Sequence, residues 1–361
     1  MNNKVSIFCL KYWRSILKRV LPPSIRGSVL FFVFILALSL VLTVCTNKTA
    51  NQGNSTASPS SIHKTKSGDA KKGSEQQDKN IPAKFSQTLI GPDEIKQAMG
   101  DPPLNGYDLY AIKVGEKEKA KKNLFIRGAS ADEEIPLVFA FFALIGGGRR
   151  ILIDSGFVDE EKIKSWKIIN YSNPASQLLK IGIKADQITD IIITHRHWDH
   201  IGGISLFPRA TCWMAEGEYN DAQLKTESSS PALFTALKQI KAENRLKFTE
   251  PFQHLFPGVA VVRQGAHTQH FQYVVLKNID GIWILPSDEI PLDENLKNNI
   301  ISGQTGNTAE SEKALQTILF LAHDKEGSIE HVIPSHEPSV FKRFPEKAPG
   351  IVQISHGAET K

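Results

Sequence analysis

Cysteine is scarce in this sequence, with three residues among 361: Cys9, Cys45 and Cys212. Only Cys212 falls after residue 85, where a globular composition begins. That part of the chain can therefore build neither a disulfide framework nor a thiolate metal cluster. A metal site there must use histidine and carboxylate ligands. Cys212 itself lies in the apolar run 210–214 and is expected to be a small buried hydrophobic residue.

Acidic residues are absent from positions 1–27, which hold six Lys or Arg, and residues 46–84 hold seven Lys against three acids. The overall formal charge is +5, and removing the +6 and +4 of these two segments leaves −5 for residues 85–361. The excess positive charge thus belongs to the N-terminal region. No nucleic-acid partner is expected, because the globular part carries no excess of basic residues.

The run from Val29 to Cys45 is apolar except for Ser39 and Thr43, and it follows the basic segment. This pattern predicts a signal or membrane anchor within residues 1–45. The positive-inside rule then puts the rest of the chain outside the cytoplasm, in a bacterial periplasm or at the cell surface. Residues 42–45 (LTVC) resemble the lipobox of bacterial lipoproteins, although Val44 departs from the small residue usual there. A lipidated Cys45 and an uncleaved transmembrane helix both stay open.

Residues 46–84 are rich in Ser, Thr, Asn, Gln and Lys and contain almost no apolar residues. Such a composition cannot offset the entropy lost on ordering, so we expect a disordered tether. The chain therefore divides into a signal or anchor (1–45), a tether (46–84) and a globular domain (85–361). It carries no signal for the oligomeric state.

Apolar runs alternate with helical stretches in the globular part, as is typical of an α/β fold. Glycine-rich turns separate two pairs of these runs, which indicates hairpins. The predicted elements are a hairpin from 137–145 and 149–154, a helix over 174–181, a buried strand over 188–194, a second hairpin from 272–276 and 281–285, and a final strand at 331–333.

The strand predicted over 188–194 ends at a cluster of potential metal ligands, His195, His197, Asp199 and His200, followed by two glycines. Histidines at alternate positions of an extended loop can point the same way. The carboxylate and imidazole after them can turn toward a second point, and the glycines are expected to let the backbone turn sharply. A lone surface histidine pair is more often solvated, but four ligand-type residues at this spacing indicate a metal site. Imidazole and carboxylate suit zinc, iron or manganese.

Residues 194–203 (THRHWDHIGG) resemble the HxHxDH motif of the metallo-β-lactamase superfamily. Other stretches resemble the further motifs of that family in the same order along the chain. The resemblance covers about residues 105–350 and implies the family's αββα sandwich, in which two mixed β-sheets are flanked by helices. The stretches are 151–156 (ILIDSG), 265–268 (GAHT), 287–288 (SD) and 334–336 (PSH).

The resemblance also implies two divalent transition-metal ions as cofactors, with zinc the expected metal, and a supporting role for Asp154. In such a site a shared water of lowered pKa attacks a substrate carbonyl as metal-bound hydroxide, and Asp199 shuttles a proton. The implied activity is metal-assisted hydrolysis of a small-molecule lactone, ester or amide. The implied ligands are His195, His197 and His267 for one metal, Asp199, His200 and His336 for the other, and Asp288 as the bridge.

Several stretches outside the ligands resemble the N-acyl homoserine lactonase-like branch, among them 146–149 and 343–345. Lactonases of this branch commonly carry a Tyr shortly after the bridging Asp, whereas residues 289–292 (EIPL) follow Asp288 here. Two alternatives stay open: a β-lactamase or thioester hydrolase of the same fold, and a non-enzymatic metal-binding lipoprotein. Lactamases whose second metal uses a cysteine are disfavoured, because Cys212 lies outside every ligand motif.

Other side chains receive more modest predictions. Tyr273 or Tyr219 would replace the missing tyrosine if either reached the pocket, and Trp198 is expected to shape the pocket wall. His270 is assigned either a supporting or a packing role. The remaining histidines are placed in or beside the last strand (His331) and on the surface (His254, His323 and His356).

Overall fold

The structure, a computed structural model, describes residues 91–224, 231–324 and 326–357. The predicted anchor (1–45) and tether (46–84) lie outside the described residues. Within the described ranges, every helix is too short or too polar to cross a membrane.

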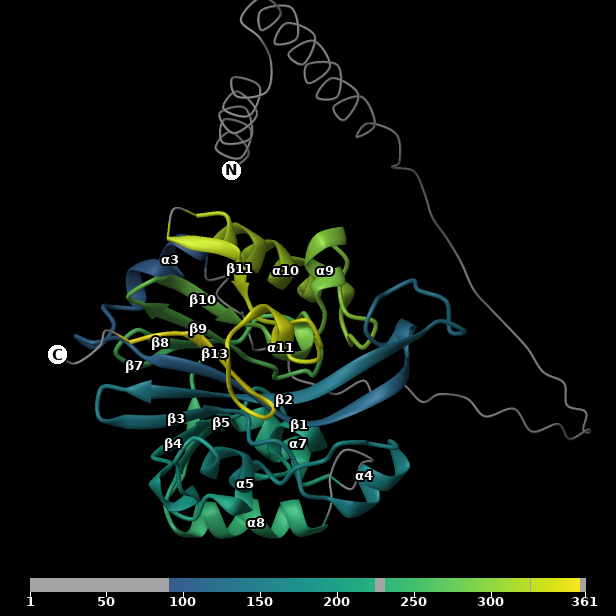
Figure 1. Cartoon of the computed structure of the whole chain (residues 1–361). Helices are drawn as coiled ribbons and strands as arrows, with labels where there is room; N and C mark the ends of the chain where they lie inside the picture. The colour runs from purple at the N-terminus through teal and green to yellow at the C-terminus, as the bar shows by residue number, and fades with distance from the viewer. Residues whose placement is uncertain (1–90, 225–230, 325, 358–361) are drawn as a thin grey trace, which may run out of the picture. The chain divides into compact units, whose positions relative to one another are not determined.

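An eight-stranded mixed sheet forms one layer of the domain, with the strand order β12-β13-β1-β2-β3-β4-β5-β6 (Figure 1). Neighbours from β12 to β3 pair antiparallel, whereas β3 to β6 pair parallel. The strands are β1 (Asp108–Lys121), β2 (Glu134–Gly146), β3 (Arg149–Ile153), β4 (Asp190–Ile192), β5 (Thr211–Ala215), β6 (Leu246–Thr249), β12 (Glu346–Ala348) and β13 (Ile351–Ser355).

A five-stranded sheet forms the second layer, with the order β11-β10-β9-β8-β7. Its strands pair antiparallel except for the parallel pair β10 and β11. They are β7 (Phe252–Phe256), β8 (Val259–Val262), β9 (Tyr273–Asn278), β10 (Gly281–Leu285) and β11 (Gly327–Val332).

Helices cover the outer face of each sheet (Figure 1). On the eight-stranded side lie α4 (Glu160–Ser165), α5 (Pro174–Leu179), α6 (Trp198–Ile201), α7 (Glu216–Ala222) and α8 (Pro231–Ala242). On the five-stranded side lie α3 (Pro92–Ala98), α9 (Asp293–Asn298) and α10 (Thr308–Ala322). The remaining elements are α11 (Val340–Arg343) and the 3-10 turns η1 (Lys122–Leu124), η2 (Ala185–Gln187), η3 (Ile204–Leu206) and η4 (Ser287–Glu289).

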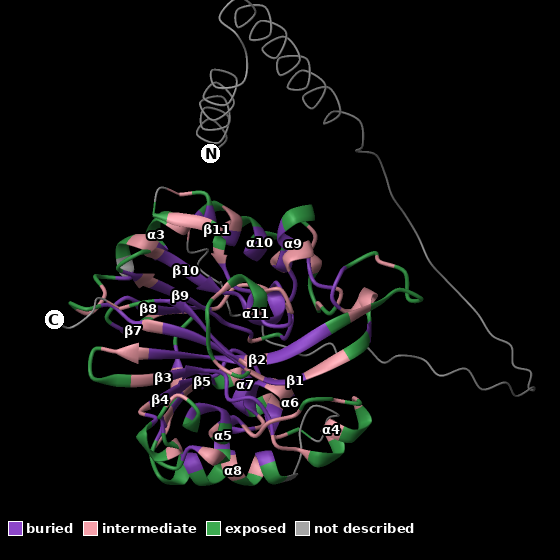
Figure 2. Cartoon of the chain, viewed as in Figure 1, coloured by how far each residue is buried: buried purple, intermediate pink, exposed green. Residues whose placement is uncertain are grey.

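Alternation along β2 shows how the layers are held together. Phe139 and Phe141 pack with the helices outside the eight-stranded sheet, whereas Phe142 and Leu144 face the core between the two sheets. This period of two is what a strand buried on both faces requires. Figure 2 shows the resulting pattern, with buried strands at the centre and exposed outer helix surfaces. The layer order is therefore helix, sheet, sheet, helix, and the predicted arrangement of two mixed sheets between helices is confirmed.

Both predicted hairpins are confirmed, as β2–β3 and β9–β10, and the predicted helix is α5. The predicted strand over 188–194 is wrong in extent, since β4 spans only Asp190–Ile192. The reason lies at Thr194, whose backbone N–H donates to the side chain of Asp154 at 2.8 Å instead of extending the strand ladder. The strand predicted at 331–333 is longer than expected and forms β11 at the sheet edge. It is not the final strand, since β12 and β13 follow it.

Candidate metal centre

The predicted site residues lie where strands end. His195 follows β4, His267 follows β8, Asp288 follows β10 and His336 follows β11. Strands β8, β10 and β11 run in one direction, so their carboxyl ends meet at one edge of the sheet. Side chains placed on loops at the ends of a rigid sheet are held in fixed relative positions.

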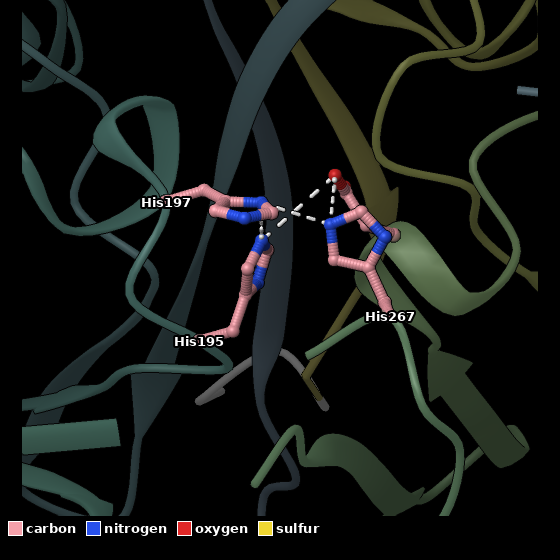
Figure 3. Close-up of side chains that lie close together, drawn as sticks. His195, His197 and His267 are labelled. Atoms are coloured by element: carbon pink, nitrogen blue, oxygen red, sulfur yellow. Dashed lines mark hydrogen bonds and ion pairs between the residues drawn. The ribbon is translucent and has the colours of Figure 1, made fainter. Parts of the chain in front are cut away.

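Three imidazoles converge to form the first set, defined as His195, His197 and His267. Nδ1 of His197 lies 3.0 Å from Nε2 of His195 and 2.9 Å from Nε2 of His267. Figure 3 shows the three rings directed toward one another. One nitrogen of each ring and one carboxylate oxygen of Asp288 all lie within 4.8 Å of one another.

The second set consists of Asp199, His200 and His336. The short helix α6 begins after His197 and carries Asp199 and His200, and the ring of His200 lies beside that of His195 with centroids 4.2 Å apart. Oδ2 of Asp199 lies 3.5 Å from Nε2 of His200 and 3.6 Å from Nε2 of His336. These three ligand atoms also lie within 4.8 Å of one another.

Asp288 presents one carboxylate oxygen to each set. Its Oδ2 lies 3.3 Å from Nε2 of His267 and 3.9 Å from Nε2 of His195. Its Oδ1 lies 3.1 Å from Nε2 of His200 and 3.0 Å from Nε2 of His336. The structure therefore brings all seven predicted ligands together in the two groups that the motifs suggested, and their binding of metal stays a prediction.

The second nitrogen of several imidazoles is fixed by a hydrogen bond. Nδ1–H of His200 donates to Oδ2 of Asp154 at 2.7 Å, and the Nδ1–H groups of His267 and His336 donate to the backbone carbonyls of Gln304 and Val138, each at 2.9 Å. Such bonds hold the ring orientation and leave Nε2 free to act as a ligand. Asp154 thus occupies the supporting position expected of it.

The two sets differ in their electrostatics. Burial lowers the pKa of His195 well below its ordinary value and that of His267 to about 3, so the first set is neutral near pH 7. In the second set, burial alone would lower the pKa of His200, but Asp288, Asp199 and Asp154 together raise it well above the ordinary value. Burial alone would raise the pKa of Asp288, yet His200, His336 and His267 hold it well below its usual range.

These properties fit divalent metal ions. Nδ1 of His197 faces Nε2 of both His195 and His267 at 3.0 and 2.9 Å, and Nδ1–H of His267 already donates to the carbonyl of Gln304. With neutral rings a single N–H must therefore serve both contacts, whereas a bound cation would satisfy all three nitrogens. In the second set, Nε2 of His200 is buried without a hydrogen-bond partner, although Oδ1 of Asp288 is 3.1 Å away. Imidazole nitrogen with carboxylate oxygen is a donor set suited to zinc and related transition metals.

A cavity of about 200 Å³ opens onto the two sets. Its floor includes the carboxylates of Asp199 and Asp288, and its wall is aromatic. Trp198 is among the wall residues, as predicted. The lining residues are Phe125, Phe139, Lys162, Trp166, His197, Trp198, Asp199, Asp288, Gln304 and His336.

Five of these lining residues escaped the sequence prediction, among them Gln304, whose backbone carbonyl accepts Nδ1–H of His267. Phe125 and Phe139 meet the ring of His336 edge-on, with centroids 5.7 and 5.3 Å away. Lys162 and Trp166 reach the cavity from α4 and its C-terminal cap. No local pattern marks any of them as functional, because their spacing is that of ordinary core or surface residues.

Two expectations about other residues need correction. Neither tyrosine is among the cavity-lining residues: Tyr273 is buried and its hydroxyl donates to Gln264, and Tyr219 packs on Phe248. Gly202 and Gly203 have ordinary φ values of −65° and −92°, so no special turn requires them. They are needed because a Cβ would overlap the carbonyl oxygens of Trp198 and Ser155.

The remaining assignments agree with the structure. Cys212 is buried in β5, and His331 lies within β11. His254, His323 and His356 are exposed. His270 is half-buried and belongs to neither set, so it has a packing role, and its backbone N–H donates to Glu218.

Comparisons with known proteins agree with this architecture. Residues 136–263 match the family model described as the metallo-beta-lactamase superfamily. The comparison with curated proteins found no match.

Several solved structures share the fold. A quorum-quenching N-acyl homoserine lactone lactonase is 17% identical, with a TM-score of 0.59, over 69% of this chain and 100% of that chain. An N-acyl homoserine lactone hydrolase with bound product is 15% identical, with a TM-score of 0.58, over 69% and 100%. AidC, a dizinc quorum-quenching lactonase, is 21% identical, with a TM-score of 0.51, over 70% and 95%. The motifs, the fold and the clustered histidines and carboxylates agree with the match of residues 136–263 to the metallo-beta-lactamase superfamily, and together they support a metal-dependent hydrolase.

Proposed function

We propose that this protein is a dinuclear hydrolase that opens a lactone or another ester, in the manner of N-acyl homoserine lactonases. The observation that carries the proposal is the placement of Asp288, whose two oxygens face different ligand sets. A bridging carboxylate of this kind would hold two metal ions close together. The likeness to solved lactonases supports the same reading, and one of these relatives is described as dizinc.

The chain's own residues define the chemistry. The first set and the second set would each hold one metal ion, with Asp288 between them. Bound metal ions would supply Lewis acidity and would lower the pKa of a water in the site. We propose zinc as the native metal, since neutral imidazoles with carboxylates form its common ligand set.

Asp199 is the residue proposed to move the proton. It lines the cavity, and its Oδ2 faces His200 and His336. Its second oxygen would take a proton from the attacking water and pass it to the leaving oxygen. Water adds to the carbonyl carbon, the bond from that carbon to the ring or ester oxygen breaks, and the products are a carboxylic acid and an alcohol. The aromatic side chains of Phe139, Trp166 and Trp198 would meanwhile exclude bulk water.

Metal content measured together with turnover tests this function. The full-length chain, purified in detergent, is assayed by elemental analysis and on a panel of lactones, aryl esters, thioesters and cephalosporins. We expect close to two transition-metal ions per chain, lactone or ester hydrolysis, and loss of turnover after chelation with recovery on adding Zn²⁺. A protein that holds no metal after expression in supplemented medium overturns the dinuclear site. If the protein hydrolyses thioesters or cephalosporins but neither lactones nor aryl esters, it is instead a thioester hydrolase or β-lactamase of the same fold.

We further propose that the chain is tethered to a membrane and that its domain faces away from the cytoplasm. The support is the apolar run from Val29 to Cys45 after a basic segment that lacks acids. Membrane fractionation with protease accessibility tests the location. Cys45→Ser distinguishes the anchors, because it blocks lipid labelling and signal cleavage only if Cys45 is lipidated. A chain found entirely in the soluble fraction refutes the tether.

A further inference from the structure

Glu218 is a buried carboxylate next to the metal centre that belongs to neither ligand set. It lies in the first turn of α7, which begins directly after β5, and its side chain is fully buried. A buried carboxylate is costly unless it accepts several hydrogen bonds, so its partners reveal what it stabilises.

The two oxygens of Glu218 bind two different loops. Oε2 accepts the backbone N–H of Arg196 at 2.9 Å and its guanidinium at 3.2 Å. Arg196 is the residue between His195 and His197. Oε1 accepts the hydroxyl of Thr268 at 2.6 Å and the backbone N–H of His270 at 3.2 Å.

The second loop also packs closely on α7. A Cβ on Gly217 would overlap the ring of His270, so the absence of a side chain there lets this ring lie against the helix. The loop that carries His267 is thus docked on the first turn of α7 by ring packing and by Glu218. From this turn, a single carboxylate reaches both loops that supply the first set.

We propose that Glu218 is a positioning residue that fixes the distance between the two histidine loops and thereby the geometry of the first set. This inference rests on the proposed metal binding by His195, His197 and His267, and it is independent of the substrate. Without the carboxylate, the N–H groups of Arg196 and His270 would lose their buried acceptor, and the loops would relax independently. In the second set, the ring of His200 is held by Asp154 instead, so metal binding there would be retained.

Glu218→Gln is the informative substitution, because its shape is nearly unchanged. An amide has one acceptor oxygen and one NH₂ donor, so it can satisfy only one of the two loops and presents a donor to the other. Asp221→Asn is the matched control. Asp221 lies on the same helix, and its Oδ2 is 3.3 Å from the guanidinium of Arg196, but it lies partly exposed at the surface.

The measurement is the affinity of the full-length chain for Zn²⁺ alone, by competition with a chromophoric chelator. Glu218→Gln is expected to weaken one of the two binding steps by about 10–100-fold, as is typical for the loss of a group that orients metal ligands. Asp221→Asn is expected to change either step by about threefold or less, as for other exposed ion pairs.

Absorption spectra with Co²⁺ identify which step is affected. His267→Ala and His336→Ala provide the reference spectra for damage to the first set and to the second set. We expect the spectrum of Glu218→Gln to change as that of His267→Ala does, with the bands of the second set retained. A general structural role would instead weaken both steps together and lower the melting temperature of the metal-free protein in proportion.

Thr268→Val provides a second route in case Glu218→Gln does not fold. It removes one hydrogen bond of the same carboxylate and is expected to weaken the same binding step by about threefold to tenfold. If either substituted chain binds Zn²⁺ with wild-type affinity and gives wild-type Co²⁺ spectra, the proposed role of Glu218 is refuted. A wild-type chain that binds no metal refutes the proposed metal site instead, so the two failures are distinguishable.

Discussion

Asp288 approaches His200 to 3.1 Å through Oδ1, while its other oxygen faces the first set. Replacing this carboxylate should therefore weaken the binding of both proposed metal ions at once. Substituting a residue that only orients a metal ligand typically weakens metal binding by roughly 10–100-fold. Asp288→Ala is expected to weaken it by more than this, because it removes a proposed ligand. His270→Ala, which removes an imidazole that packs beside the first set without belonging to either set, should lose less metal than Asp288→Ala. Elemental analysis after dialysis checks both variants, and equal losses would mean that the bridge is misassigned.

The support of His200 gives a second prediction. Asp154 accepts Nδ1–H of His200 with Oδ2 and two hydrogen bonds from Thr194 with Oδ1. Asp154→Asn turns one acceptor into a donor, so either His200 or Thr194 loses its partner. We expect metal binding at the second set to weaken by about 10–100-fold, and binding at the first set to weaken less, since Asp154 reaches it only through the contact of the Thr194 hydroxyl with Nδ1 of His195 at 3.0 Å.

A buried carboxylate that contacts no ligand serves as the control for Asp154→Asn. Asp190 in β4 accepts from Arg149 at 2.8 Å and from Trp213 at 3.0 Å. Asp190→Asn should lower the melting temperature without changing Zn²⁺ affinity. Co²⁺ spectra in which Asp154→Asn alters the first set alone would contradict the assigned support.

The clustering of the ligand-type residues could be predicted because four of them lie within six residues of one another, where spacing along the chain determines spacing in space. The residues that support this cluster could not be predicted in the same way. Glu218 lies 50 residues before Thr268 in the sequence, and nothing in the sequence around it differs from an ordinary helix start. Contacts of that kind depend on how β5 and β8 are placed in two different sheets, and a single sequence does not specify this placement.

The longest strand was also missed by sequence patterns. Residues 115–121 of β1 read GEKEKAK, a charged stretch without the apolar alternation of a half-buried strand. Pairing with β2 nevertheless continues to Lys121, opposite Glu134. Backbone hydrogen bonds along the hairpin form whatever the side chains are, so the ladder extends beyond the apolar part of the sequence.

The glycines after His200 were recognised, but their role is close packing, which φ preferences do not reveal.

Cys212 provides a prediction that does not involve the metal. Burial raises the pKa of its thiol to about 12. At pH 8.5 about one thiol in a thousand or fewer would therefore be the reactive thiolate, against about half for an ordinary exposed cysteine. In a chain with Cys9→Ser and Cys45→Ser, the remaining thiol should resist iodoacetamide when folded and react readily in guanidinium. Rapid alkylation of the native protein would show that β5 opens or that the site is not buried.

The final prediction concerns the substrate and follows from the proposed bridging role of Asp288. Two metal ions held close together favour attack on lactones and esters, since the second ion can stabilise the alkoxide leaving group directly. We therefore expect kcat/KM for lactones or esters to exceed that for cephalosporins.

The rate of lactone hydrolysis should be limited because a hydrogen-bond donor to the developing oxyanion is missing. Lactonases of the branch that this chain resembles commonly place a Tyr after the bridging Asp, whereas Ile290 is buried here and Glu289 accepts the backbone N–H groups of Ala266 and His267. Loss of one such donor costs on the order of 10²–10³ in rate. Weak turnover of acyl homoserine lactones is thus expected unless another lining donor, Lys162 or Gln304, takes that place. Kinetics of the Zn²⁺-loaded chain on matched lactones, aryl esters and cephalosporins decide the matter, and rapid cephalosporin hydrolysis without measurable lactone or ester opening refutes the assignment.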